Sequence, residues 1–434
     1  MHLSFHHKLL YLIGKIFNKI ILVPHPDSIG NASEEIYFAT LKARKENKKL
    51  AIIFVKKIPF FLDHLGFYDI NFFNLKSKYF VFSHNSFFQK FWGIVFSIYF
   101  VFSRIIHSFL TKFFDVKKSG YYWRPMAGND TIWRPDPNLL KFDIEIFKKQ
   151  KWDEQLQYSL DIDLTDKVNF KCKEIFRSLG YDKKEFVCIH ARDGGYKKDF
   201  LTNSLNVNIE NYASSIEKIC KNGTMVFRLG DPTMVKLPSI DNFIDYPFVD
   251  YKSPEMDIYL IKNCKFIICM GSGPFSAAKY LFQKKMLFVN HAQFLIDMPF
   301  NKDSLTIFKQ PFSRSKQRYL SLKELLLSFK DVSNKWWIGE DIEMKENNEQ
   351  EILESTIEML NKDKNNLPTA LQEEFRKYYF NALNYWVNHF RFSDETELEN
   401  CNEWYRQSVN MFYWNGQISN IFLQKNWNEN SRNI

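Results

Sequence analysis

The chain has 434 residues, of which 45% are hydrophobic, and a formal net charge of +9. This composition is that of a globular protein with apolar residues enough for two core-forming domains. The six cysteines are scattered and form neither a CxxC pair nor a Cys/His cluster, which excludes a zinc-ribbon or disulfide framework and predicts reduced thiols.

The positive charge is confined to the N-terminal part of the chain. Residues 1–120 carry 17 Lys+Arg against 7 Asp+Glu, whereas the remaining 314 residues carry 42 against 43. Because the basic stretch is also crowded with Phe, Leu and Ile, it favours an anionic membrane surface over nucleic acid as a partner. Residues 1–19 lack an uninterrupted apolar stretch, so we expect no secretory signal and a cytoplasmic protein, peripheral at the inner face of the membrane.

Strand-like apolar runs begin the chain at residues 20–24, 51–55 and 79–83, with a helix-length segment after the first. The first run leads into a polar loop that contains Asp27, Gly30 and Asn31, and a helix is expected from about Glu34. Residues 91–114 form the most hydrophobic window and are interrupted by Arg104. Residues 91–102 supply twelve uncharged residues before this interruption, too few to span a bilayer. A helix here is either a core helix or an interfacial helix lying among lipid head groups.

Four further runs follow at residues 186–190, 224–228, 266–270 and 286–290, again alternating with helix-length segments. Such alternation predicts an α/β protein with parallel sheets covered by helices. The apolar spacing of residues 350–361, 371–390 and 418–427 predicts three helices. We therefore expect an N-terminal domain at 1–165, a second domain at 166–335 and a helical C-terminal extension at 336–434.

Glycine is scarce, yet six of the 15 glycines lie between residues 190 and 275, and three of these glycine sites come just after predicted strands. The carboxyl ends of parallel strands form the ligand crevices of open α/β sheets. His190 ends the run at 186–190. Arg192 and Tyr196 lie in the loop that follows this run. A forked, permanently charged guanidinium such as that of Arg192 suits the oxygens of a diphosphate, although a surface pair with Asp193 is the alternative.

Two more strand ends carry similar signals. Arg228, Gly230 and Asp231 follow the strand at 224–228, and Asp231 before a proline is equally typical of a turn. Ser272, Gly273 and Ser276 stand at the start of a helix, whose first-turn amides offer a metal-free anion site. Asp257, in the first turn of the preceding helix, favours the helix dipole or contacts a ligand.

Asp161 and Asp163 have the spacing of an acidic metal-binding pair. Asp166 extends this run beside an expected helix start, where carboxylates stabilise the dipole. We regard the pair as the basis of an alternative only.

The segments HARDGGY (190–196), FRLGDP (227–232) and SPEMDIYLIKNCKFIICMGSGPFSAAKYLFQKKMLFVN (253–290) together resemble a family of bacterial glycosyltransferases associated with surface polysaccharides. That family is distantly similar to GT-B fucosyltransferases. The resemblance implies a GT-B-like fold, with two Rossmann-like domains facing a cleft. It also implies inverting, metal-independent transfer from a nucleotide sugar to a glycan or polyprenyl-linked acceptor, without a cofactor and without nucleic acid.

The resemblance assigns roles to individual positions. His190 and Arg192 correspond to the His-x-Arg motif that contacts the donor diphosphate, and Ser272 and Gly273 correspond to a serine-containing loop. The expected donor-binding residues are His190, Arg192, Tyr196, Arg228, Gly230, Asp231, Asp257, Ser272, Gly273 and Ser276. The expected catalytic residues are Arg192, Asp27 and Asn31, the last standing where many family members have a histidine.

Two alternatives remain open from the sequence. One is a non-catalytic protein that binds a glycan or lipid phosphate in polysaccharide assembly. The other is a metal-dependent glycosyltransferase that uses Asp161 and Asp163.

Overall fold

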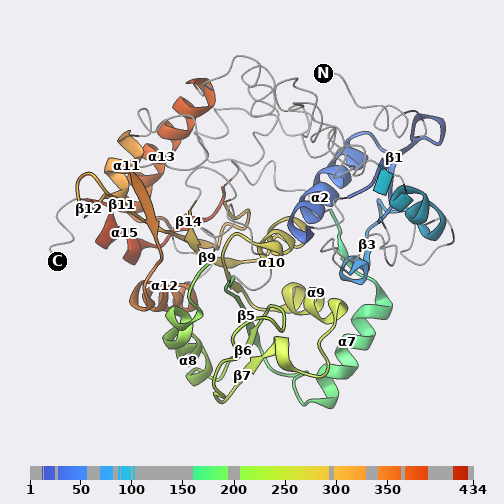
Figure 1. Cartoon of the computed structure of the whole chain (residues 1–434), viewed down its shortest axis with the longest axis horizontal. Helices are drawn as coiled ribbons and strands as arrows, with labels where there is room; N and C mark the ends of the chain where they lie inside the picture. The colour runs from blue at the N-terminus through green and yellow to red at the C-terminus, as the bar shows by residue number, and fades with distance from the viewer. Residues whose placement is uncertain are drawn as a thin grey trace.

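A computed structural model gives the fold of the chain (Figure 1). It describes residues 12, 14–24, 28–55, 69–81, 87, 89–98, 101–102, 160–193, 206–292, 298–328, 341–362, 367–389 and 414–428.

The largest element is a seven-stranded sheet in which all neighbouring strands run parallel, in the order β14-β10-β9-β8-β5-β6-β7. Its strands are β5 (Phe186–His190), β6 (Met225–Arg228), β7 (Phe243–Asp245), β8 (Ile267–Cys269), β9 (Met286–His291), β10 (Leu305–Phe308) and β14 (Gln417–Ile418). β5, β6, β8 and β9 match the four predicted runs, and every residue in them is buried. The prediction of an α/β protein with a parallel sheet is confirmed.

Helices cover both faces of this sheet (Figure 1). On one side lie α7 (Asp166–Ser178) and α9 (Pro254–Asn263), and on the other α8 (Ala213–Lys221) and α12 (Glu349–Asn361). Coverage on both faces explains why the central strands are continuous apolar runs without alternation.

The N-terminal part contains a second, smaller parallel layer. β1 (Lys19–Leu22) pairs with β2 (Lys49–Ile52) through the crossover helix α2 (Ile29–Lys45). The third predicted run joins as a single parallel bridge between Leu50 and Phe80. A short antiparallel pair, β3 (Leu75–Lys76) with β4 (Asp163–Leu164), connects this layer to the start of α7.

Part of the predicted 91–114 helix is described: residues 87, 89–98 and 101–102 are helical, and the remainder lies outside the described residues. Within the described part of the chain, no helix has both the length and the apolar character needed to cross a membrane.

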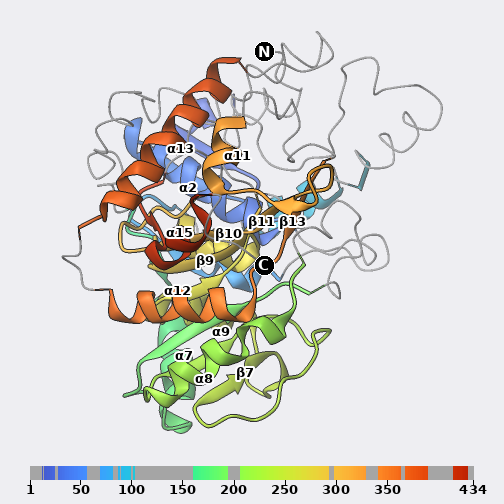
Figure 2. The same ribbon diagram turned by 90° about the vertical axis from the view of Figure 1, so that its left-hand side faces the viewer.

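The C-terminal helices are confirmed as α12, α13 (Ala370–His389) and α15 (Asn420–Asn426). The segment is not purely helical as predicted, because β14 extends the main sheet and β13 (Ile342–Lys345) pairs with β11 (Gln310–Ser313). β11 also pairs with β12 (Arg318–Tyr319), which precedes α11 (Leu322–Ser328). Figures 1 and 2 show α12 lying along α8, so this segment completes the layer over the main sheet. The predicted domain boundaries at 165 and 335 stay predictions.

Buried polar bonds fix the C-terminal segment to the sheet. The Asn347 side chain accepts from the Asn290 backbone N–H at 2.8 Å and donates to the Phe308 carbonyl at 2.8 Å. In return, the Asn347 backbone N–H donates to the Asn290 side chain at 2.7 Å. A single asparagine thus satisfies backbone groups at the ends of two strands.

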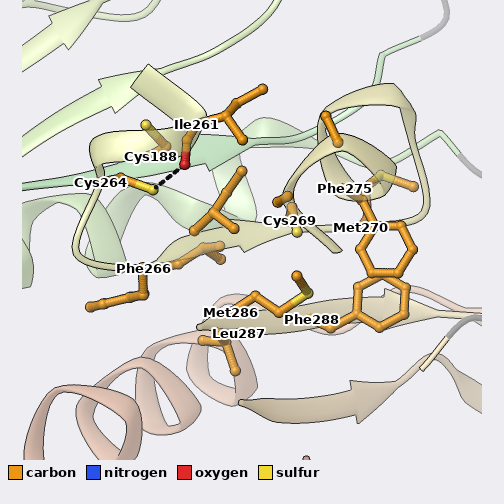
Figure 3. Packing of buried hydrophobic residues seen from close by; sticks show 14 of the residues in the cluster. Cys188, Ile261, Cys264, Phe266, Cys269, Met270, Phe275, Met286, Leu287 and Phe288 are labelled. Atoms are coloured by element: carbon orange, nitrogen blue, oxygen red, sulfur yellow. Dashed lines mark hydrogen bonds between the residues drawn. The ribbon is translucent and has the colours of Figure 1, made fainter. Parts of the chain in front are cut away.

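A stacked pair of aromatic rings holds α10 against the core of the main sheet. In Figure 3 the Phe275 ring, from α10 (Gly273–Ser276), lies on the Phe288 ring of β9, with centroids 4.2 Å apart and planes 10° from parallel. The five described cysteines are buried and unbridged, and the Cys264 thiol donates to the Ile261 carbonyl at 3.2 Å (Figure 3).

We predict that Asn347→Leu lowers the free energy of unfolding by about 3 kcal/mol, because it leaves the buried Asn290 N–H and Phe308 carbonyl unpaired. Urea denaturation measures this change. The exposed Asn222 supplies the control, and Asn222→Leu is expected to change stability by less than about 0.5 kcal/mol. Equal stability of the two variants would show that the hydrogen bonds of Asn347 do not stabilise the fold.

Candidate functional site

The carboxyl ends of β8, β5 and β6 lie side by side, because these strands are adjacent and parallel. His190 at the end of β5 is in register with Cys269 of β8, and Ile189 is in register with Arg228 of β6. The loops after the three strands therefore emerge at one edge of the sheet, and these loops carry the three polar motifs of the sequence.

His190 stands at the centre of this edge. It is buried, and its Nδ1 lies 3.1 Å from the Ser272 hydroxyl, which also donates to the Met270 carbonyl at 3.0 Å. Since a hydroxyl has one proton, Ser272 accepts from His190 when it donates to Met270. The imidazole then carries its proton on Nδ1, and Nε2 is an acceptor.

The electrostatics keep this imidazole neutral. Burial lowers the pKa of His190 from 6.5 to about 4, and the positive charges of Arg192 and Arg228 add to the effect. His190 is therefore a neutral hydrogen-bonding group at pH 7, and any cationic contact to an anion comes from elsewhere.

Arg192 is held by its backbone and is partly exposed. Its N–H donates to the Met270 sulfur at 3.4 Å, and its carbonyl accepts from the Val207 N–H at 2.9 Å. These two bonds tie the residue to the segment after β8 on one side and to residue 207 on the other. The guanidinium therefore starts from a fixed backbone position beside His190.

Arg228 is fully buried and engaged within the protein. Its Nη1 donates to the Val235 carbonyl at 2.7 Å and lies 3.3 Å from the Asp245 carboxylate, which also accepts from the Leu237 N–H at 2.8 Å. Burial lowers the pKa of Arg228 and raises that of Asp245, while each charge acts on the other in the opposite sense. The structure thus gives Arg228 an ion pair that joins β6 to β7, where the sequence predicted a contact to a ligand.

Gly230 and Asp231 form the turn after β6. The Asp231 carboxylate accepts from the Thr233 N–H at 2.9 Å, as in an Asx turn. Gly230 has φ +155°, and a Cβ there would overlap the Met234 sulfur. The local structure of this turn therefore explains both the glycine at 230 and the aspartate at 231 without a ligand.

Asp257 lies in the first turn of α9 and forms an ion pair with Lys252 at 2.9 Å. Burial raises its pKa, and the charge of Lys252 opposes that effect. The Asp257 carboxylate is thus engaged by Lys252 within the protein.

The first turns of α10 and α2 lie against each other. Ser272 is the N-cap residue of α10, but its hydroxyl is bonded to His190 and Met270 and makes no capping bond. A Cβ at Gly273 would lie 3.4 Å from Ile29, and a Cβ at Gly30 would lie 3.1 Å from the Ser276 hydroxyl. The start of α2 is thereby placed directly against α10, the helix that follows β8.

The N-terminal candidates for a proton acceptor differ in their surroundings. Asn31 is partly exposed, and its N–H donates to the Ser28 hydroxyl at 3.3 Å. Glu34 accepts from the Tyr280 hydroxyl at 3.1 Å, and Glu35 is fully buried. His25, Asp27 and Tyr196 lie outside the described residues.

Sequence reasoning missed the groups that join α2 to the helix after β8. Tyr280 lies in the π-helical turn η5 (Ala277–Leu281) beside the fully buried Lys279. The Lys279 ammonium lies 4.6 Å from the centre of the Tyr280 ring and 4.7 Å from that of Phe300. In sequence these residues are indistinguishable from an ordinary apolar helix, so no signal could have revealed them.

The acidic pair of the alternative hypothesis is bound by lysines. Asp161 lies 2.6 Å from Lys78, and Asp163 forms an ion pair with Lys262. Because each carboxylate is neutralised by a different lysine, the two are not arranged to share one cation. Among the described residues, no group of three or more His, Cys, Asp or Glu side chains is placed to hold a metal ion.

No protein-family model matches the chain, and no curated protein matches it significantly. Among solved structures, the glycosyl transferase family 9 protein from Veillonella parvula DSM 2008 aligns over 66% of this chain and 84% of its own, with 10% identity and a TM-score of 0.33. A likeness at this level carries no conclusion about activity.

We predict that stability falls with His190 protonation. The unfolded chain binds a proton at pH 6.5 and the folded chain only near pH 4, so stability is complete above pH 6.5 and declines as the pH falls through that window. The difference corresponds to about 3 kcal/mol. Urea denaturation at pH 7 and pH 4 measures the free energy of unfolding. Between these pH values the wild type should lose about 3 kcal/mol more of this free energy than His190→Asn does. If both proteins lost the same free energy of unfolding, the pKa of His190 would not be lowered by folding.

Proposed function

We propose that the protein is a metal-independent GT-B glycosyltransferase that transfers a sugar from a nucleotide sugar to a glycan or polyprenyl-linked acceptor in bacterial surface polysaccharide synthesis. The small parallel layer with α2 would be the acceptor-side domain, and the seven-stranded sheet would bind the donor. Reaction at the cytoplasmic face of the membrane, where nucleotide sugars are made, belongs to the same proposal.

One observation carries the proposal: a partly exposed arginine, a neutral histidine and an uncapped helix start meet at one edge of a parallel sheet. Arg192 supplies a permanent charge beside His190, and the hydroxyl of Ser272 leaves the α10 amides without a side-chain cap. These are the groups that hold a diphosphate without a cation. Open space at Gly271, where a Cβ would meet no atom within 4 Å, leaves room for phosphate beside the backbone.

Charge development explains how these groups would act. As the bond between the anomeric carbon and the diphosphate breaks, negative charge grows on the leaving phosphate. A guanidinium fixed at that position stabilises the charge more in the transition state than in the bound donor. His190, whose Nε2 is an acceptor, would take a hydrogen bond from a hydroxyl group of the donor and, by its bond to Ser272, aligns the loop that starts α10.

The acceptor hydroxyl must lose a proton as it attacks the anomeric carbon. Glu34 is bonded to Tyr280 and Glu35 is fully buried, so neither is presented to an acceptor. Asn31 has no basic group and would orient the acceptor through its amide. The proposal therefore assigns the base to Asp27, with His25 as the other titratable group of that loop.

We predict that Arg192→Ala lowers the turnover number at least about 100-fold, because it removes the charge that stabilises the leaving group. Purified protein is assayed for transfer and for donor hydrolysis. Circular dichroism and thermal melting verify the fold. The exposed Arg177 on α7 provides the matched control, and Arg177→Ala should retain full activity. Near-normal turnover of Arg192→Ala would refute the assignment.

The same assay separates the alternatives. Activity that persists in EDTA excludes dependence on Asp161 and Asp163 with a metal. Absence of both transfer and hydrolysis, together with donor binding, would favour a non-catalytic binding protein.

We further predict that Gly271→Ala abolishes donor binding without affecting folding. An alanine fits at this position in the free protein, but its methyl group would occupy the space proposed for phosphate. A thermal-shift screen with UDP-, GDP-, CMP- and dTDP-sugars identifies the donor from the rise in melting temperature of the wild type. The variant should melt at the wild-type temperature alone and lose that rise. An unchanged rise would place the diphosphate elsewhere.

A further inference from the structure

Residues 87, 89–98 and 101–102 are helical, and their apolar side chains point toward solvent. Phe87, Phe91, Ile94, Ile98 and Phe102 recur every three or four residues and therefore line one face of a helix. Their exposed fractions are 84%, 51%, 49%, 47% and 60%. The rings of Phe87 and Phe91 are stacked with centroids 6.4 Å apart. We call these five side chains the apolar stripe.

The polar face of this helix points inward instead. Gln89, Gly93 and Ser97 are buried on the opposite side. With its amide oriented to satisfy both atoms, Gln89 donates to the Ile52 carbonyl at 2.7 Å and accepts from the Phe54 N–H at 2.6 Å. The Ser97 hydroxyl donates to the Gly93 carbonyl at 2.6 Å. The two bonds of Gln89 hold this side of the helix against the end of β2, so the apolar face points outward.

The part of the sequence that carries the stripe is basic. Lys90 is exposed on the same helix, and residues 1–120 carry a net charge of +10. A second exposed group, Leu12, Ile16 and Phe17, lies next to the exposed Lys15, just before β1. Figure 1 shows both segments at the right-hand edge of the molecule, away from the seven-stranded sheet.

We propose that the stripe of residues 87–102 is a docking surface for an anionic lipid bilayer. The apolar side chains would enter the boundary between head groups and acyl chains, and the lysines would contact the lipid phosphates. Charge complementarity selects a bilayer over a second copy of the chain, since two copies would bring two strongly basic regions together. The helix would lie along the membrane plane.

Vesicle sedimentation of the full chain tests this inference. The wild type should bind phosphatidylglycerol/phosphatidylcholine vesicles, bind pure phosphatidylcholine weakly and lose binding at high salt. The triple variant Phe91→Ser, Ile98→Ser, Phe102→Ser should bind anionic vesicles at least about tenfold more weakly. A control triple variant, Phe170→Ser, Leu179→Ser, Val235→Ser, removes exposed apolar side chains elsewhere and should bind like the wild type.

The outcomes are separable from those for glycosyl transfer. Arg192→Ala should bind vesicles normally, so the membrane proposal survives even if the transferase proposal fails. Equal vesicle binding by the stripe variant and the wild type would overturn the proposal. So would a change from dimer to monomer in the stripe variant, measured by analytical ultracentrifugation, with vesicle binding unchanged, because the stripe would then be a protein interface.

Discussion

The close approach of two helix starts determines how this protein is arranged. The first turn of α2 rests on the first turn of α10 because Gly30 and Gly273 present no side chains at the contact, and a Cβ at Gly30 would lie 3.1 Å from the Ser276 hydroxyl. The bond from Tyr280 to Glu34 holds the same two elements together one turn further on. This contact brings the start of α2, from the small N-terminal layer, to the ligand edge of the large sheet, and a two-substrate site of the proposed kind requires that proximity.

The charges at that edge are divided between structure and binding. Arg228 and Asp245 neutralise one another inside the protein, where breaking the pair would leave a buried charge. Arg192, two residues past β5, is partly exposed beside a histidine that burial keeps neutral. A neutral His190 can bond to Ser272 and to a ligand without adding a second charge. In the proposed function, binding of the anion therefore depends on one arginine and on backbone amides.

The sequence predicted the parallel sheet because its central strands are apolar on both faces. A continuous apolar run of this kind can be recognised without knowing which strands lie beside it. It missed β10, and it missed β7 and β14, which have only three and two residues. It could not predict the hydrogen bonds of Asn347, whose partners are 39 and 57 residues away. At the candidate site it found His190, Arg192 and Ser272 from glycines after strands. It could not distinguish Arg192 from Arg228, because pairing with Asp245 depends on the register of β6 and β7.

The helix of residues 87–102 is linked to the same arrangement. Its polar side is held inward by backbone groups at positions 52 and 54, immediately after β2, so its apolar side must face outward. β1 and β2 are parallel, and both therefore end at the edge of the small layer where α2 begins and contacts α10. The bonds of Gln89 hold the stripe's helix at the end of β2. If the acceptor is a polyprenyl-linked glycan, a bilayer bound to that stripe would present the glycan on the side of the small N-terminal layer.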